Sequence, residues 1–345
     1  MLSADNSSVS AIFAQLLNGL DKGGAYALIA LGLTLVFGTL GVVNFAHGAI
    51  FMLGAFCGVA FNRLITLSAH VKDPAVTFFD AYKEVPYLQT WFGDFGSAII
   101  DYAVPLSVLF AIPAMALIGL AMERGLIRFF YKRPHADQIL VTFGLAIVLQ
   151  EIVRIFFGAN PISIAAPAAL AGSADIGSLF GLTGVVYPWW RLVYFAFSVV
   201  VIGAVFAFLQ FTTYGMVVRA GMRDREMVGL LGINIQKRFT FVFGIATVVA
   251  GLAGTMYAPI VPPSYRFGMD YLVLSFVVVV VGGMGSLGGA ILAGFVLGIL
   301  QSFASMNEVK QIIPGIDTVI VYLIAVVVLL VRPRGLLGRA GVMES

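Results

Sequence analysis

The chain has 345 residues, of which 60% are hydrophobic and only 11% are charged, with a net charge of +3. Soluble domains carry about 25% charged residues, so this composition excludes a water-soluble globular protein. The apolar stretches are continuous rather than alternating, as in residues 192–211 and 271–281, which favours helices over the strands of a membrane barrel. We therefore predict an all-α, polytopic integral membrane protein.

The apolar stretches predict eight or nine crossings, because a helix needs about 20 apolar residues to span the bilayer. They lie at about residues 12–40, 47–66, 101–121, 138–157, 190–211, 239–258, 270–283, 288–305 and 317–331. The first is long and contains glycines, and the seventh is short. The residues before the first apolar run include one acidic residue, Asp5, and no basic one. We therefore expect this run to stay as a membrane segment rather than to be a cleaved signal peptide. A single membrane domain is predicted over residues 11–335.

Lysine and arginine residues predict the orientation of the chain. They gather in three regions, which fall on one face if there are nine crossings: Arg124, Arg128, Lys132 and Arg133; Arg219, Arg223, Arg225, Lys237 and Arg238; Arg332, Arg334 and Arg339. By the positive-inside rule this face is cytoplasmic, with the N-terminus outside and the C-terminus inside. The opposite face receives the loops of residues 67–100 and 159–188. Residues 67–100 are long enough for a partly helical cap or a partner contact. Basic residues at the ends of spans argue against a nucleic-acid partner.

Glycines mark two kinds of feature. Pairs at four-residue spacing predict close helix packing in the membrane: Gly19 and Gly23, Gly54 and Gly58, Gly294 and Gly298. Five glycines within residues 282–289 instead interrupt a helix, because each glycine costs about 1 kcal/mol relative to alanine. Two interpretations stay open, a break that lines a pathway and a tight turn at the cytoplasmic edge. Gly282, Gly283 and Gly285 are candidate pathway residues.

A second irregular point is the sequence Asn-Phe-Ala-His-Gly at residues 44–48. Asn44 is suited to cap the following helix, since its side chain can accept from free backbone donors. For His47 we favour capping or packing over a gating role, and both over proton or metal chemistry. Asn44, His47 and Gly48 are candidate pathway or gating residues, and no metal site is predicted.

Ionisable residues within the spans are sparse. Glu151 and Arg154 are expected to pair near the outer end of their helix. Asp21 and Lys22 lie in the outer part of the first segment. Ion-driven carriers use acidic residues or histidines at mid-membrane, and no such chain of residues is evident, which weakens that interpretation. We expect a mostly apolar pathway without a buried cluster of charges.

The cytoplasmic loop of residues 214–238 carries the clearest signal for a partner. Residues 219–232 mix charged with apolar side chains and predict a short amphipathic helix that ends at Gly232. Such a helix suits insertion into a groove on another protein, and the alternative is a helix lying on the membrane surface. The candidate coupling residues are Arg219, Arg223, Asp224, Glu226, Met227, Leu230, Leu231 and Gly232.

Several segments carry a resemblance to a known family. Residues 16–20 read Leu-Leu-Asn-Gly-Leu, residues 24–35 read Gly-Ala-Tyr-Ala-Leu-Ile-Ala-Leu-Gly-Leu-Thr-Leu, and residues 44–48 follow. Together they resemble the opening of permease subunits of branched-chain amino acid ABC importers. Residues 226–234 look like that family's cytoplasmic coupling segment, and residues 250–254 and 282–289 resemble its later glycine signatures. The similarity runs from about residue 11 to residue 335.

The resemblance implies a complex in the bacterial inner membrane. Its other members would be a homologous second permease, two ATP-binding subunits and an extracytoplasmic solute-binding protein, with surrounding membrane lipid. The loop of residues 67–100 looks longer than the family usually has. The chain itself contains no Gly-x-x-x-x-Gly-Lys-Ser/Thr phosphate loop, so we expect it to bind no cofactor and to be no enzyme, with ATP hydrolysed by the partner subunits.

The sequence leaves other functions open. The same importer class could carry urea, amides or small carboxylates, and the second permease could be identical or homologous. A stand-alone secondary carrier would transport without ATP or a binding protein. A membrane-embedded enzyme would need clustered polar residues, yet the three histidines, His47, His70 and His135, are far apart in sequence.

Overall fold

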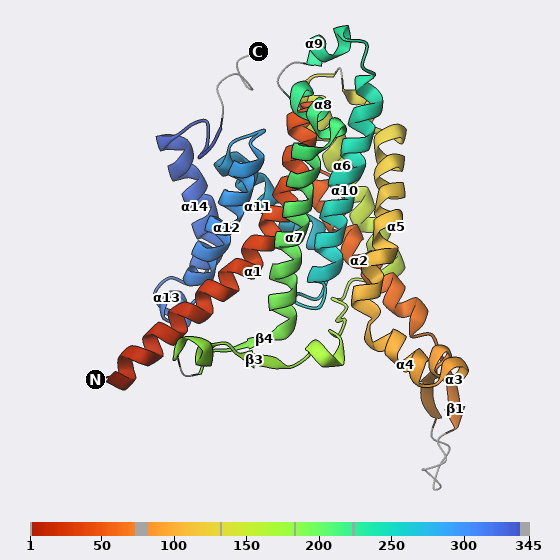
Figure 1. Cartoon of the computed structure of the whole chain (residues 1–345), viewed down its shortest axis with the longest axis vertical. Coiled ribbons are helices and arrows are strands. Elements are labelled where there is room, and N and C mark those ends of the chain that lie inside the picture. The colour runs from red at the N-terminus through yellow and green to blue at the C-terminus, as the bar shows by residue number, and fades with distance from the viewer. Residues whose placement is uncertain (1, 73–81, 132, 183, 223–224, 339–345) are drawn as a thin grey trace.

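The computed structural model describes residues 2–72, 82–131, 133–182, 184–222 and 225–338 as a bundle of helices (Figure 1). Within these residues seven helices are long and apolar enough to cross a bilayer, and two shorter apolar helices, α11 and α14, bring the number to nine. This confirms the predicted polytopic all-α fold. The nine are α1 (Leu2–Leu40), α2 (His47–Ile65), α5 (Ala103–Gly125), α6 (His135–Phe157), α7 (Trp189–Phe211), α10 (Ile235–Tyr257), α11 (Phe267–Gly282), α12 (Leu287–Ala304) and α14 (Ile316–Val331).

Short elements connect these helices. Two antiparallel hairpins pair β1 (Ser68–Lys72) with β2 (Tyr82–Pro86) and β3 (Ser173–Asp175) with β4 (Val186–Pro188). The remaining elements are α3 (Tyr87–Phe92), α4 (Asp94–Asp101), η1 (Ile127–Phe130), η2 (Ala168–Leu170), η3 (Gly177–Phe180), α8 (Thr213–Gly221), α9 (Arg225–Leu230) and α13 (Asn307–Ile312).

The bundle has two distinct ends. The described parts of the three basic regions lie at the end that carries α8, α9 and the last turn of α14, at the top of Figure 1; we call this the basic end. The hairpins, α3, α4 and α13 lie at the opposite end, together with the start of α1; we call this the loop end. The predicted separation of basic regions from long loops is therefore present in the fold.

Glycines bring α1 and α12 into close contact, as their four-residue spacing predicts. A Cβ atom built on Gly23 would lie 2.8 Å from the Cα of Phe295, and one on Gly294 would lie 2.7 Å from the backbone nitrogen of Ala27. Gly54 of α2 faces the backbone of Gly251 in α10 in the same way. Because real side chains do not approach backbone this closely, only glycine permits these helix pairs.

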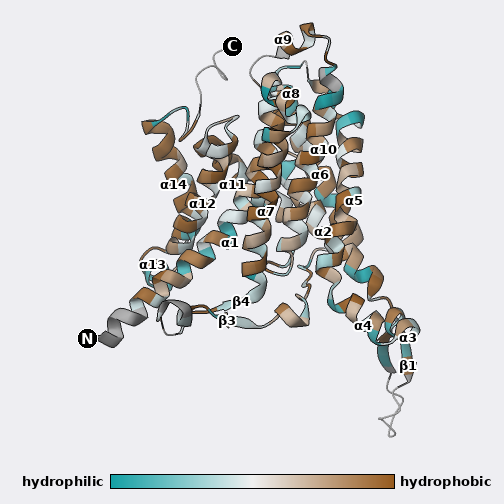
Figure 2. Ribbon diagram, in the orientation of Figure 1, coloured by the Kyte–Doolittle hydropathy of each residue, from teal (hydrophilic) through white to brown (hydrophobic). Residues whose placement is uncertain are grey.

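The long helix α1 runs through the interior, where it contacts α7, α10, α11 and α12. Outer helices expose apolar side chains instead, such as Leu117 of α5, Leu140 of α6, Val200 of α7 and Leu323 of α14. Figure 2 shows mostly hydrophobic ribbon along these helices, with hydrophilic residues gathered near the two ends. Apolar surface around the whole bundle is what a lipid environment requires, since lipid offers no partners for polar groups.

Candidate functional site

The connection after α1 turns back into the bundle. α1 ends at Leu40, Gly41 has a φ of 60°, and α2 begins at His47. Gly32 lies about two turns before the end of α1, yet a Cβ built there would be only 2.6 Å from Nε2 of His47. Residue 47 is therefore level with a point about two turns before the end of α1, so α2 begins inside the bundle.

Hydrogen bonds to Asn44 and Thr142 fix this turn. The Oδ1 atom of Asn44 accepts from the backbone nitrogen of Ala46 at 3.0 Å, which closes an Asx turn. The N-cap of α2 is Ala46, which has no side-chain capping bond, so the predicted helix cap is wrong and Asn44 instead stabilises the turn before the helix. The backbone nitrogen of Phe45 donates to Oγ1 of Thr142 in α6, also at 3.0 Å. The turn is thus held from both sides although it lies away from water.

His47 and Gly48 are buried packing residues. His47 is 0% exposed and fills the space that Gly32 leaves, and neither ring nitrogen reaches a partner with full hydrogen-bond geometry among the described residues. Gly48 lies against the carbonyl of Gly268 and against Leu272 of α11, where a side chain would have no room. The structure supports packing for both residues, and a gating role for them stays a prediction.

The glycine-rich segment forms a tight turn between α11 and α12 at the basic end. Gly283 and Gly285 have φ values of 102° and 81°, which residues with side chains rarely adopt. Ser286 caps α12 by accepting from the backbone nitrogen of Gly289 at 3.2 Å. Part of the C-terminal segment covers the turn, because the backbone nitrogen of Leu337 donates to the carbonyl of Gly282 at 3.0 Å.

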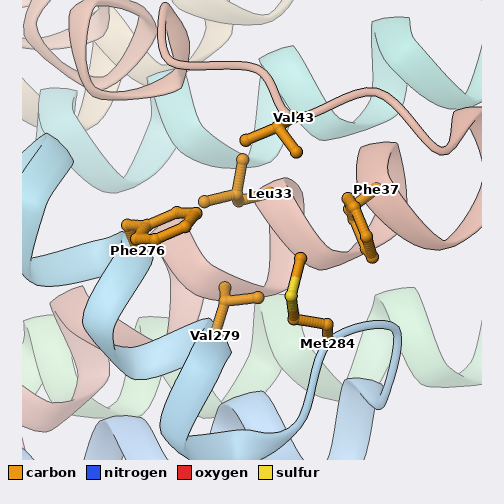
Figure 3. Close-up of a pocket in the computed structure, with 6 residues that line it drawn as sticks. All are labelled: Leu33, Phe37, Val43, Phe276, Val279 and Met284. Carbon is orange, nitrogen blue, oxygen red and sulfur yellow. The ribbon is translucent and has the colours of Figure 1, made fainter. Parts of the chain in front are cut away.

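The two irregular turns meet at one small apolar pocket (Figure 3). Val43 directly precedes Asn44, and Met284 lies between Gly283 and Gly285, so each predicted pathway segment supplies a lining side chain. The other lining residues come from α1 and α11, and the complete set is Leu33, Phe37, Val43, Phe276, Val279 and Met284. All six lining side chains are apolar, so the two turns meet through apolar contact alone.

The predicted amphipathic helix of residues 219–232 is instead two short helices. α8 ends at Gly221, and α9 starts at Arg225 and contains Glu226; Arg223 and Asp224 lie outside the described residues. Thr212 interrupts the chain after α7 by capping α8, since its Oγ1 accepts from the backbone nitrogen of Gly215 at 3.0 Å. The break inside residues 219–232 comes at the other end of α8, where Gly221 is the last helical residue and glycine is a poor helix former.

The predicted coupling face on α9 is largely exposed. Met227, Leu230 and Leu231 are 56%, 82% and 71% exposed, whereas Val228 packs inward at 5%. α9 ends at Leu230, and Gly232, two residues further on, has a φ of 78°, in keeping with the predicted helix stop. Arg219 of α8 is hydrogen-bonded to Gln210 of α7.

Gly38 of α1 links this loop to the glycine turn. A Cβ built on Gly38 would contact the terminal methyl of Met222, which follows α8, and would lie 3.6 Å from the Cα of Gly285. The end of α8, the last turn of α1 and the glycine turn therefore meet at one point.

A buried ion pair near the loop end was not predicted from the sequence. Asp21 of α1 lies 3.2 Å from Arg191 of α7, with side chains 1% and 32% exposed. The hydroxyl of Tyr187 in β4 donates to Asp21 at 3.1 Å, and Arg191 donates to Oδ1 of Asn18 at 3.0 Å. Burial, and after it the charge of Asp21, raises the pKa of Tyr187, which keeps this donor protonated. In the sequence, Asp21 stands out as an acidic residue inside a long apolar stretch. Its partner could not be found there, because Arg191 lies 170 residues further along the chain.

Comparisons with known proteins agree with this architecture. The family model for the permease component of the branched-chain amino acid transport system matches residues 15–330. The chain is 30% identical to the high-affinity branched-chain amino acid permease protein BraD of Pseudomonas aeruginosa, over 94% of this chain and 95% of that protein. It is 27% identical to LivH of Escherichia coli K12, with the same coverage, and 26% identical to a probable LivH of Methanocaldococcus jannaschii, over 90% and 88%. No solved structure matches. The chain belongs to the family of branched-chain amino acid transport permeases.

Proposed function

We propose that the chain is the membrane-spanning permease of an ATP-driven importer that moves branched-chain or related amino acids into the cytoplasm. The family match over residues 15–330 carries this proposal. The chain would bind no cofactor and catalyse no reaction, and partner subunits would hydrolyse the ATP.

The proposed complex contains a homologous second permease, two ATP-binding subunits and an extracytoplasmic solute-binding protein. The basic end would face the cytoplasm of a bacterial inner membrane, since lysine and arginine are retained on that side. The loop end, with the start of α1, would then face outward and receive the binding protein. Selection of the cargo would rest mainly with that protein.

Coupling would run through α9. Leu230 and Leu231 present apolar surface at the basic end on a helix too short to be stable alone, which suits insertion into a groove on an ATP-binding subunit. A push on α9 would reach α8 and then Met222, which rests on Gly38 beside Gly285. The glycine turn and the pocket would move as a result, opening a pathway between the two permeases toward the cytoplasm.

Transport by the reconstituted complex tests the proposed function. Proteoliposomes that contain both permeases and the ATP-binding subunits, with the binding protein and leucine outside, should take up leucine only when ATP is inside. The chain reconstituted alone should take up none. Leucine accumulation by the chain alone would establish a stand-alone carrier. ATP-dependent uptake of urea, an amide or a small carboxylate, without leucine uptake, would establish the alternative cargo class.

A double substitution on α9 tests the coupling route. Leu230→Asp with Leu231→Asp should abolish uptake and co-purification of the ATP-binding subunits, because charge replaces the apolar contact. The matched control is Ile312→Asp with Ile313→Asp, a pair 80% and 53% exposed at the loop end, which should keep the ATP-binding subunits bound. Full retention of those subunits by the α9 variant would refute the docking role.

A further inference from the structure

Residues 87–101 form a helical elbow at the loop end. α3 and α4 are joined by Gly93, which has a φ of 55°, and Gly96 of α4 packs directly against the carbonyl of Leu88 in α3. Only Tyr102 separates α4 from the membrane helix α5. We call residues 87–101 the aromatic elbow, and Figure 1 shows it beside the loop ends of α2 and α5, to one side of the bundle.

Four aromatic side chains of this elbow are exposed rather than packed against the bundle. Trp91, Phe95 and Phe92 are 73%, 68% and 56% exposed. Tyr87 is 43% exposed, and its ring centroid lies 5.7 Å from that of Trp91. Large apolar surface in water is unfavourable by roughly 25 cal/mol per Å², so a contiguous exposed patch of this kind marks an interaction site.

The patch continues the lipid-facing surface of the bundle. Leu109 on the first half of α5 is 67% exposed, and Leu64 at the end of α2 is 59% exposed. The rings of Phe61 and Phe110 tie α2 to α5 at this level, with centroids 5.6 Å apart. Because only Tyr102 separates α4 from α5, the elbow leaves the bundle at the loop end of these two apolar helices.

The chemistry of the elbow matches lipid rather than a charged partner. Tryptophan and tyrosine favour the headgroup level of a bilayer, and phenylalanine favours the boundary with the acyl chains. The elbow itself, residues 87–101, contains no lysine or arginine and carries the acidic residues Asp94 and Asp101, so it offers no positive charge of its own to anionic headgroups. An insertion driven by apolar burial alone should be independent of lipid charge and of salt.

We infer that the aromatic elbow is an interfacial anchor, with Trp91, Phe92 and Phe95 immersed in the leaflet at the loop end. The elbow would hold the loop ends of α2 and α5 at the bilayer surface. Its role is independent of the cargo and of ATP, and therefore of the proposed transport function.

Trp91 provides a direct probe in the full chain. We would reconstitute the wild-type chain and Trp91→Phe in phosphatidylcholine nanodiscs, and their fluorescence difference isolates Trp91 from the other two tryptophans. Lipids brominated on the acyl chains should quench this component more strongly than aqueous iodide does. Doping with anionic lipid, or raising the salt concentration, should leave the ratio of the two quenching efficiencies unchanged.

Charged substitutions provide the matched test. Phe92→Glu with Phe95→Glu should invert the quenching ratio so that iodide dominates, whereas Val71→Glu, on β1 and 46% exposed, should not. Stronger iodide than bromolipid quenching of wild-type Trp91 would overturn the inference. Iodide quenching that disappears only when the solute-binding protein is added would also overturn it, and would assign the patch to a protein contact.

Discussion

Arg191→Ala should destabilise the bundle more than Asp21→Ala, although both substitutions break the same ion pair. The reason is the unequal burial of the partners, with the Asp21 side chain 1% exposed and that of Arg191 32% exposed. Without Arg191, a carboxylate is left inside the bundle with the hydroxyl of Tyr187 and the backbone nitrogen of Lys22 as its remaining donors. Without Asp21, the guanidinium keeps its bond to Asn18 and its access to solvent.

The expected magnitudes follow from these environments. Stranding a fully buried charge costs about 3–5 kcal/mol, but a carboxylate can avoid this cost by binding a proton. Protonation from an ordinary carboxyl pKa near 4 costs about 1.4 kcal/mol per pH unit, so at pH 7 it limits the loss to about 4 kcal/mol. We therefore expect about 3–4 kcal/mol for Arg191→Ala. For Asp21→Ala we expect about 1–2 kcal/mol, because Arg191 remains partly solvated.

Unfolding in sodium dodecyl sulphate at two pH values tests this reasoning. At pH 5.5 protonation costs only about 2 kcal/mol, so the loss for Arg191→Ala should shrink toward that value. The loss for Asp21→Ala should not change. Glu151→Ala serves as the control, since Glu151 and Arg154 pair at 3.1 Å with side chains about half exposed, and it should cost less than about 1 kcal/mol. Equal losses for the two Asp21–Arg191 variants at pH 7, or a loss for Arg191→Ala that does not depend on pH, would refute the argument.

Three predictions on glycines and turns accompany this one. Gly298→Leu should lower the thermal midpoint of the purified chain, because the side chain would meet the backbone of α1; Gly203→Leu, at an open position of α7, should leave the midpoint unchanged. Asn44→Ala should cost about 1 kcal/mol in detergent unfolding by removing the side-chain hydrogen bond that closes the turn before α2, and unchanged stability would contradict that role. Gly283→Leu should block uptake by the reconstituted complex, since its φ of 102° and the C-terminal segment exclude a side chain; normal uptake would mean that the turn rearranges freely.

Much of the fold could be predicted because the bilayer imposes local rules. Continuous apolar stretches gave the nine helices within a few residues at most ends, and the basic regions gathered at one end as expected. The Glu151–Arg154 pair also followed from spacing along one helix. The start of α1 at Leu2 was missed, because its polar first turns carry no membrane signal.

In the candidate site too, the features that depend on neighbouring residues could be predicted, and the others could not. Gly232 could be assigned as a helix stop because that role depends on neighbouring residues. Asn44 was predicted to cap α2 and instead closes the turn before it. Residues 219–232 were predicted as one helix, and the end of α8 at Gly221 was not recognised. Exposure of Leu230 and Leu231 agrees with the amphipathic pattern, and their docking role stays a prediction.

The sequence by itself determined that this chain is a helical membrane permease, where its spans lie and which turns are irregular. Only the tertiary structure decided that the turns at Val43 and Met284 share one pocket, that Met222 and Gly285 meet at Gly38, and that Asp21 pairs with Arg191. The physical reason is the distance along the sequence over which each interaction acts. Hydropathy, capping and glycine strain act within a few residues, whereas these contacts join segments far apart in the sequence and depend on how the helices pack against one another.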